Sequence, residues 1–362
     1  MSTKSICMVA GEASADRHAA AVIRALKDIM PRAEIFGMGG PAMAEAGMEC
    51  IYGIHGFSVM GFSDVLPRIM HIRSVYRGLC DAVRERKPDV VVPVDLPDFN
   101  MRLAGNLKRS GFKVLYYIAP QAWAWRRYRA RTLSRITDGL AVIFPFEEAF
   151  FSSYGVNARY VGHPFTEEMS DRAPKAVWPP SRISLMPGSR MHEIQAIMPV
   201  MLQAKRIVQR IHPHVTWHLP VAPGLERPTL ESLADPDIEL SAALPAADLA
   251  MVKSGTSSFE MAIKGIPEII CYRTSVLNYL LARAFVKLDH VGMPNIILGR
   301  PAVPELIQND LTPERLAREA LEIIEDEQRY LKMQQSFDEM RRMLGNASPS
   351  QGVAAWIANM AG

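Results

Sequence analysis

Three short segments in the second half of the chain combine small residues, hydroxyl groups and charge in a way that suits a phosphate-bearing nucleotide. Gly188-Ser189-Arg190 stands between an apolar run and a helical pattern, where backbone N–H groups and a guanidinium can point at one anion. Ser254-Gly255-Thr256 occupies the same kind of junction and lets a diphosphate approach the backbone. Glu260 follows about one turn into the helical pattern, where its carboxylate can accept hydrogen bonds from ribose hydroxyls; the alternative is a capping box with Ser257.

The first half offers carboxylates suited to general-base catalysis. Asp95 and Asp98 follow a continuous apolar run at residues 90–94, so both are expected where a buried parallel strand ends. A carboxylate in that place can take a proton from an attacking hydroxyl group. The alternative for either aspartate is that it caps the following helix. The residues alone leave the choice between the two open.

Tryptophan and arginine gather between residues 123 and 135. Trp123 and Trp125 precede Arg126, and further arginines follow at positions 127, 129, 131 and 135. Paired indoles beside a basic helix can hold an anionic, acylated molecule or lie at a phospholipid surface, whereas a solvated basic face over buried tryptophans is the alternative. Residues 57–70 are apolar with basic neighbours, which fits either an interfacial patch or a core segment.

Other patterns look like ligand sites but lack the necessary partners. Residues 37–42 match the loose dinucleotide pattern G-x-G-x-x-A, yet no acidic residue closes a later strand at the expected distance. Asp235 and Asp237 form a D-x-D in a turn-like segment, and the histidines between residues 212 and 218 have no carboxylate or cysteine partner in the pattern. We therefore expect neither a metal ion nor a cofactor.

The elements that must position these residues are parallel strands with crossover helices. Short apolar runs, each followed by a turn and a helical pattern, are typical of such sheets. The predicted strands cover residues 6–9, 90–94, 114–118 and 140–144 in the first half and residues 183–186, 215–219, 249–252 and 268–272 in the second. Residues 313–344 predict consecutive amphipathic helices.

The length of the chain and a proline-rich segment near its middle predict two domains. The 362 residues exceed what one hydrophobic core normally supports. Residues 171–182 contain three prolines, which can neither continue a helix nor donate into a central strand, so this is the expected linker. We predict an α/β fold with two Rossmann-like domains, residues 1–172 and 173–362, that face a cleft into which the strand ends open.

Composition excludes several classes of protein. A hydrophobic share of 49% and a charged share of 22% are ordinary for a globular protein, and a net charge of +3 is too mild to indicate nucleic acid. The four cysteines are far apart, which predicts reduced thiols in the cytoplasm rather than zinc or a disulfide framework. The sequence shows neither a signal peptide nor a membrane span, so any membrane contact is expected to be peripheral.

Several motifs together resemble those of the lipid-A-disaccharide synthase family, in the same order and across nearly the whole chain. They are Ala-Gly-Glu-Ala-Ser-Ala-Asp at 10–16, Pro-Asp-Phe-Asn at 97–100, Trp-Ala-Trp-Arg at 123–126, Pro-Phe-Glu at 145–147, Gly-His-Pro at 162–164, Leu-Met-Pro-Gly-Ser-Arg at 185–190, Ser-Gly-Thr at 254–256 and Met-Pro-Asn at 293–295.

The resemblance implies a GT-B fold and an inverting, metal-independent glycosyl transfer. The donor would be UDP-2,3-diacylglucosamine and the acceptor 2,3-diacylglucosamine 1-phosphate, and the products a β-1,6-linked disaccharide 1-phosphate and UDP. It further implies a cytoplasmic protein attached peripherally to the inner membrane. A homodimer with exchanged C-terminal segments is also implied, in which the last helix packs back on the first domain or crosses to the partner.

Residue roles follow from the same resemblance. Asp98 carries over as the base, with Asp95 beside it less certain, and Arg190 neutralises the leaving diphosphate. Gly188, Ser189, Ser254, Gly255, Thr256, Glu260 and Asn295 line the donor, whereas Ser14, Asp16, Trp123, Trp125 and Arg126 belong to the acceptor or lipid side.

The chain departs from the family pattern at two places. Ala15 stands where the loop usually has glycine, and a positive φ there would cost alanine about 1 kcal/mol and shift the loop. Residues 257–259 also differ from the usual run before Glu260, which helix geometry should tolerate.

Two other functions compete with this prediction. UDP-sugar 2-epimerases share the two-domain architecture and a similar nucleotide site, but they act on soluble sugars and do not need the apolar and tryptophan–arginine surfaces. A non-catalytic nucleotide or lipid binder is the other alternative.

Overall fold

The computed structural model describes residues 3–54, 65–168, 177–222, 225–241, 246–275, 279, 283 and 288–362. The chain divides into two compact units, one formed by Met1–Glu167 with Leu344–Gly362 and the other by Glu168–Met343. The predicted boundary at residues 172 and 173 lies outside the described residues, as do residues 171–176 of the predicted linker and residues 57–64 of the apolar segment.

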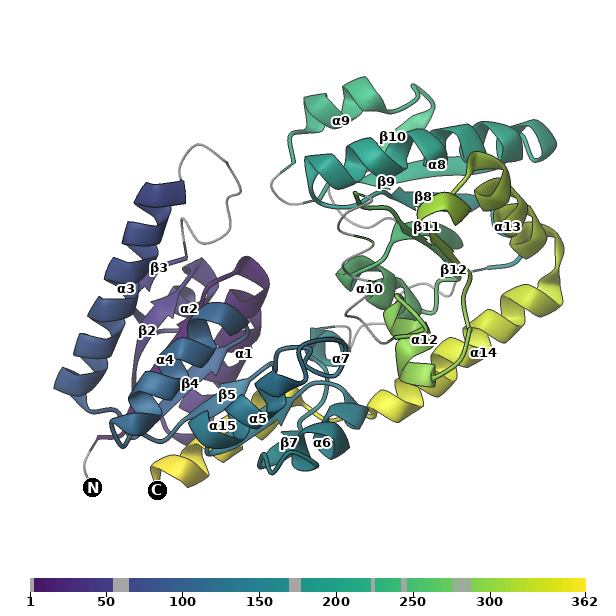
Figure 1. Cartoon of the computed structure of the whole chain (residues 1–362). Helices are drawn as coiled ribbons and strands as arrows, with labels where there is room; N and C mark the ends of the chain where they lie inside the picture. Colours follow the sequence, from purple (N-terminus) through teal and green to yellow (C-terminus); the bar gives the residue numbers. More distant parts are fainter. Residues whose placement is uncertain are drawn as a thin grey trace. The chain divides into compact units, whose positions relative to one another are not determined.

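The first unit is built on a seven-stranded, wholly parallel sheet of order β3-β2-β1-β4-β5-β6-β7. Its strands are β1 (Ser5–Ala10), β2 (Glu34–Gly39), β3 (Glu49–Gly53), β4 (Val90–Val94), β5 (Leu115–Tyr117), β6 (Gly139–Val142) and β7 (Ala158–Tyr160). The helices are α1 (Ala13–Ile29), α2 (Pro41–Glu45), α3 (Val65–Arg86), α4 (Pro97–Arg109), α5 (Tyr128–Ile136), α6 (Pro145–Ser152), α7 (Pro164–Glu168) and α15 (Pro349–Ala361) (Figure 1).

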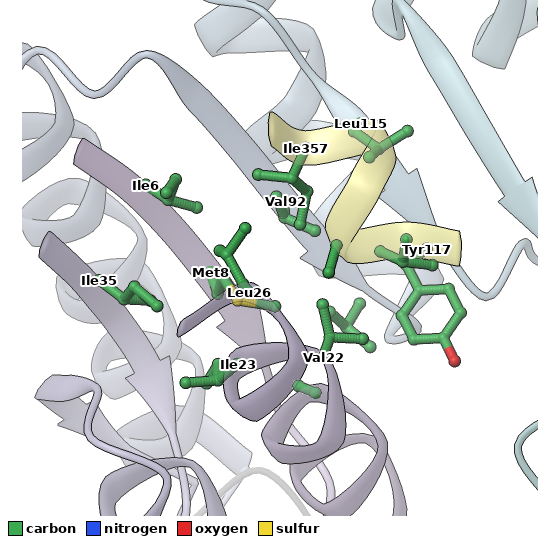
Figure 2. Close-up of a cluster of buried hydrophobic side chains, with 14 of the residues drawn as sticks. Ile6, Met8, Val22, Ile23, Leu26, Ile35, Val92, Leu115, Tyr117 and Ile357 are labelled. Carbon is green, nitrogen blue, oxygen red and sulfur yellow. The ribbon is translucent and has the colours of Figure 1, made fainter. Parts of the chain in front are cut away.

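Helices cover both faces of this sheet, as the continuous apolar strands require. Alternate residues of β1 and β4 pack against α1 and α15 on one face, and the intervening residues pack against α3 and α4 on the other. Figure 2 shows Ile357 of α15 beside Val92 and Leu115, with Leu26 of α1 close to Met8. The last helix of the chain therefore completes the core of the first unit.

The second unit has a six-stranded parallel sheet of order β10-β9-β8-β11-β12-β13. Its strands are β8 (Arg182–Met186), β9 (Thr216–Pro220), β10 (Ile238–Ser241), β11 (Leu249–Lys253), β12 (Glu268–Tyr272) and β13 (Glu305–Ile307). Its helices are α8 (Met191–Ile211), α9 (Arg227–Leu233), α10 (Thr256–Lys264), α12 (Met293–Leu298), η2 (Gln308–Asp310), α13 (Pro313–Glu325) and α14 (Glu327–Leu344) (Figure 1). Two Rossmann-like units are thus confirmed.

The structure corrects the predicted inventory in detail. All eight predicted strands are present within a residue or two, and β2, β3, β7, β10 and β13 are additional strands. Ile29 and Ile211 are about half exposed at 49% and 53% because each lies at the last residue of its helix. None of the helices formed by the described residues is long and apolar enough to cross a bilayer.

Candidate active site

The strand order of each sheet reverses at one place, and the predicted site residues follow the strands at that place. In the first sheet the reversal lies between β1 and β4, and in the second it lies between β8 and β11. Loops that leave the carboxyl ends of such neighbouring strands diverge and make the usual ligand site of a doubly wound sheet. The topology therefore gives each unit its own candidate half-site.

Two glycines shape the half-site of the second unit. Gly188 lies between β8 and α8 with φ +130°, and Gly255 lies between β11 and α10 with φ +150°. Residues that carry a side chain rarely adopt these backbone angles. A Cβ atom on Gly188 would also lie only 2.6 Å from Oε2 of Glu193. Both loops thus expose their backbone at the N-terminus of a helix, where an anion is favoured.

Charged side chains surround the two loops. Glu193 lies in the first turn of α8, and its Oε1 atom is 2.9 Å from Nζ of Lys253 and 3.7 Å from Nη1 of Arg190. Its Oε2 atom accepts a hydrogen bond of 3.2 Å from the backbone N–H of Ser189. Burial raises the pKa of Glu193, but the hydrogen bond and charge of Lys253, the Ser189 amide and Arg190 outweigh burial and lower it overall. The sequence alone assigned no role to Glu193 or Lys253.

The remaining predicted donor residues have different environments. Ser254 is nearly buried, and its hydroxyl donates to the carbonyl of Val291 at 2.8 Å. Thr256 is the exposed first residue of α10. The capping box is not formed, because Gly255 is the N-cap and no side chain caps this helix. Glu260 instead forms an ion pair of 2.8 Å with Lys264, four residues later, and stays partly exposed.

Asn295 is fully buried and its side chain is engaged within the protein. Its Nδ2 atom donates to the Val303 carbonyl at 2.9 Å and to Oε1 of Glu305 at 2.8 Å. Its Oδ1 atom accepts from the N–H groups of Ala302 and Val303 at 2.7 and 2.9 Å. A direct contact between this amide and a donor would have to break one of these bonds. Asn295 therefore fixes the loop after α12.

The half-site of the first unit contains a strained turn. Asp95 and Leu96 follow β4 with φ angles of +50° and +49°, which are unfavourable for residues other than glycine. The amide of Asn100 holds this turn by donating to the carbonyls of Val94 at 3.0 Å and Asp95 at 2.8 Å, and the Tyr116 hydroxyl donates to the Asp95 carbonyl at 2.7 Å. Such strain persists only where the surroundings impose it, and it concentrates at functional sites.

The two candidate bases differ in environment. Asp95 is half-buried, and burial, followed by the charge of Glu12, raises its pKa. Asp98 lies in the first turn of α4, and its side chain is 80% exposed. It forms ion pairs with Arg129, which is buried, and with Arg126 at 3.9 Å. No side chain caps α4, so neither aspartate serves as the helix cap.

The arginines around Asp98 also organise Trp125. The guanidinium of Arg126 lies 4.0 Å from the centre of the indole ring and that of Arg129 lies 5.8 Å from it. Trp125 is 41% exposed, so it presents an aromatic face flanked by positive charge. Trp123 is different, because it is buried and donates from Nε1 to Glu147 at 2.9 Å. Trp123 is therefore a core residue rather than a surface residue.

Asp16, which was predicted on the acceptor side, is hydrogen-bonded within the first unit. Its carboxylate is buried and accepts hydrogen bonds from the N–H groups of Gly40 at 2.7 Å, Ala42 at 3.0 Å and Met43 at 3.1 Å. Asp16 thus binds the N-terminus of α2. Ser14 is half-buried in the first turn of α1, and Ala15 lies in the same helix without a positive φ.

The discounted metal patterns are engaged in ion pairs. Asp237 lies 2.6 Å from Nζ of Lys205, and Asp235 lies 2.7 Å from Nη2 of Arg206. His212 lies 3.0 Å from Glu325. Cations already neutralise the D-x-D carboxylates.

Comparison with known proteins identifies similar sequences and folds. A sequence model of the family described as lipid-A-disaccharide synthetase matches residues 6–355. A lipid-A-disaccharide synthase of Anaeromyxobacter dehalogenans (strain 2CP-C) is 40% identical over 97% of this chain and 96% of its own, and one of Myxococcus xanthus (strain DK1622) is 38% identical over 98% and 97%.

Solved structures with low sequence identity share the fold. A UDP-N-acetylglucosamine 2-epimerase structure described as putative, from Listeria monocytogenes, has a TM-score of 0.65 at 13% identity and covers 99% of this chain and 96% of its own. The calicheamicin glycosyltransferase CalG4 has a TM-score of 0.61 at 13% identity, with coverage of 99% and 98%. These likenesses establish the GT-B fold and do not distinguish epimerase from transferase.

Proposed function

Because the chain belongs to the lipid-A-disaccharide synthase family of glycosyltransferases, we propose that it joins UDP-2,3-diacylglucosamine to 2,3-diacylglucosamine 1-phosphate. The 6-hydroxyl of the acceptor attacks the anomeric carbon of the donor, the bond from that carbon to the diphosphate breaks, and UDP leaves. The product is a β-1,6-linked disaccharide 1-phosphate. The observation that carries this proposal is the pair of glycine-bearing loops at the reversal of the second sheet, which offer helix N-termini beside Arg190.

The second unit would bind the donor. Backbone N–H groups of the 188–190 and 254–256 loops would hold the diphosphate, and Arg190, whose side chain is 61% exposed, is free to turn toward it. Glu260 would accept hydrogen bonds from the ribose hydroxyls. Asn295 would act indirectly, by holding Glu305, whose carboxylate accepts the N–H groups of Val291 and Gly292 beside the carbonyl that accepts the Ser254 hydroxyl. Negative charge grows on the diphosphate as the glycosidic bond breaks, so these groups stabilise the transition state without needing a metal ion.

The first unit would activate the acceptor. We assign Asp98 as the base because its carboxylate is exposed to solvent and so can be reached by a substrate, and we keep Asp95 as the alternative because its carboxylate is less accessible. The proton of the attacking hydroxyl passes to the base while the new bond to the anomeric carbon forms. Arg126 and Trp125 would face the acceptor or the lipid, with Ser14 nearby on the first helix.

Because the acyl chains of the proposed substrates are embedded in a bilayer, we expect the protein to be cytoplasmic and to attach peripherally to the inner membrane. Trp125 and Tyr128 are 41% and 61% exposed beside the arginines of α5, and Ile69 and Met70 are exposed on α3, so both elements carry apolar side chains that suit a phospholipid surface. Sedimentation with vesicles that contain anionic phospholipid tests this attachment. Absence of co-sedimentation at low salt would contradict it.

We also propose a homodimer that exchanges its C-terminal segments. The helix α15 buries Val353, Trp356 and Ile357 in the first unit, although the chain reaches it directly from the second unit. The same apolar face fits an identical unit of a partner equally well. Light scattering after size-exclusion chromatography measures the mass, and a monomer at all concentrations would refute the exchange.

The test of the function is an assay with the two diacylated substrates in the presence of a chelator. The wild-type protein should form the disaccharide 1-phosphate and UDP, and should not convert UDP-N-acetylglucosamine to its 2-epimer. Asp98→Asn should lower kcat by about 10²- to 10⁴-fold, the usual contribution of a general base. Arg190→Ala should weaken donor use. Asp81→Asn, in an exposed pair with Arg84, is the matched control and should behave as the wild type.

Other results of this assay would change or refute the proposal. Full activity of Asp98→Asn with loss of activity in Asp95→Asn would move the base to Asp95. Loss of product in the chelator, restored by a divalent cation, would refute the metal-independent mechanism. Epimerisation without disaccharide formation would refute the proposed transfer.

A further inference from the structure

One ion pair connects the two loops of the second half-site. Lys253 is the last residue of β11, and Glu193 lies in the first turn of α8, which follows the neighbouring strand β8. The 2.9 Å contact between their side chains therefore spans the reversal of the sheet. Both side chains are partly shielded, with exposed fractions of 23% and 10%.

Both loop glycines border this ion pair. A Cβ atom on Gly188 would lie 2.6 Å from the Glu193 carboxylate, and one on Gly255 would lie 3.8 Å from Nζ of Lys253. The ammonium group of Lys253 is therefore beside the backbone of the loop that begins α10. It occupies the place from which a cation can reach an anion bound to that loop.

We propose that Lys253 binds the diphosphate of the sugar-nucleotide donor, and that Glu193 holds Lys253 and Arg190 in place until the donor arrives. This inference rests on the proposed function and adds a second cation to the donor site. On binding, the ammonium group of Lys253 turns from the carboxylate of Glu193 toward the phosphate oxygens. Glu193 keeps its hydrogen bond from Ser189 and remains near Arg190.

Charge explains why the arrangement suits a diphosphate. Arg190 and Lys253 carry two positive charges and Glu193 one negative charge, so the three residues together have a net charge of one positive unit. A sugar diphosphate has two negative charges, and the departing UDP acquires a further one when the glycosidic bond breaks. A second cation is therefore worth more in the transition state and with UDP than with the intact donor.

The alternative is an ion pair that only supports the fold. Such a pair would affect the uridine part and the diphosphate part of the ligand equally, because its loss would disturb both loops. A phosphate contact would affect only ligands that carry the diphosphate. Comparing the effect of a Lys253 substitution on the affinity for uridine with its effect on the affinity for UDP therefore separates the two explanations.

The experiment measures the affinity of UDP and of uridine by calorimetry for the full-length wild type and for Lys253→Met. We expect UDP binding to weaken by about 10-fold or more, the loss of one charge-assisted contact, while uridine binding changes by less than about 2-fold. Lys253→Arg should restore most of the UDP affinity. Arg227→Ala, which breaks an exposed ion pair with Glu231 on α9, is the matched control and should leave both affinities unchanged.

A second variant keeps the inference testable if Lys253→Met does not fold. Lys253→Met combined with Glu193→Gln removes both charges, and the same loss of UDP binding relative to Glu193→Gln alone is expected. Equal losses for UDP and uridine, or no loss for either, would overturn the inference. A wild-type protein that binds UDP through Lys253 but forms no disaccharide would instead refute the proposed function.

Discussion

Glu268 offers a direct test of how burial acts on this fold. It is the first residue of β12 and is fully buried, and within the described part of the chain neither carboxyl oxygen has a hydrogen-bond partner. Burial, and then the charge of Glu305, raises the pKa of Glu268 well above its ordinary value of 4.5. The folded protein therefore keeps a proton that the unfolded chain releases.

The sign of the pH dependence follows from this difference. Above the unfolded pKa the folded state binds one more proton than the unfolded state, so the free energy of unfolding falls as the pH rises. Glu268 contributes a decrease of about 1.4 kcal/mol per pH unit, from about pH 4.5 until it ionises in the folded protein as well. Its contribution to stability is complete below that window and is lost across it.

Glu268→Gln removes this dependence with little change in shape. Glutamine and the protonated glutamic acid are both neutral, so the two proteins should be about equally stable at low pH. Above about pH 5, the variant should gain on the wild type by about 1.4 kcal/mol per pH unit.

Urea unfolding at several pH values, followed by tryptophan fluorescence, to which the buried Trp217 contributes, measures the difference. Glu231→Gln on the exposed surface is the control and should show no such trend. Parallel pH profiles for wild type and Glu268→Gln would refute the buried, protonated carboxyl group.

Two further predictions concern residues close to the half-sites, Glu305 in β13 and Ala15 in the first turn of α1. Glu305→Ala removes the acceptor of the N–H groups of Val291 and Gly292, at 3.1 and 2.9 Å, so it should lower the free energy of unfolding by about 1.5–3 kcal/mol and raise the KM for the donor. Glu305→Gln should recover part of the stability and part of the KM. An unchanged KM in Glu305→Ala would show that these hydrogen bonds do not support the donor site. Ala15→Gly should lower the free energy of unfolding by about 0.5–1 kcal/mol in urea, because the position is helical, and a stabilised variant would show that it is not.

The central strands were predictable because burial on both faces leaves a continuous apolar run. Val90–Val94 is such a run, and its predicted bounds agree with β4. The strands that sequence reasoning missed have no such signal. Strands β7 and β13 contain three residues each and include a charged residue, the exposed Arg159 and the largely buried Glu305, and β3 lies at the edge of the sheet. Neighbouring strands rather than local composition determine that these segments pair.

The loops of the candidate site were also predictable, whereas the partners of their side chains were not. Gly188 and Gly255 follow strands in the sequence, and both have positive φ angles. Asp16 illustrates the limit, because its hydrogen bonds go to residues 24 to 27 positions later. The sequence pattern indicates that Asp16 lies in the first turn of a helix. It does not indicate that the N-terminus of another helix, α2, lies beside the carboxylate. Within the G-x-G-x-x-A segment at residues 37–42, the N–H groups of Gly40 and Ala42 donate to Asp16, a contact that no local sequence pattern could predict.

The pair Asp95 and Asp98 illustrates the same limit in the chemistry. Three residues apart in sequence, they have opposite environments, because the turn after β4 buries Asp95 while the first turn of α4 exposes Asp98 to Arg126 and Arg129. Burial makes the ionised Asp95 a stronger base but restricts access to it. The arginines hold Asp98 in place and can bind a phosphate group beside it. A base for a large acylated acceptor needs access first and strength second, and this ordering favours Asp98.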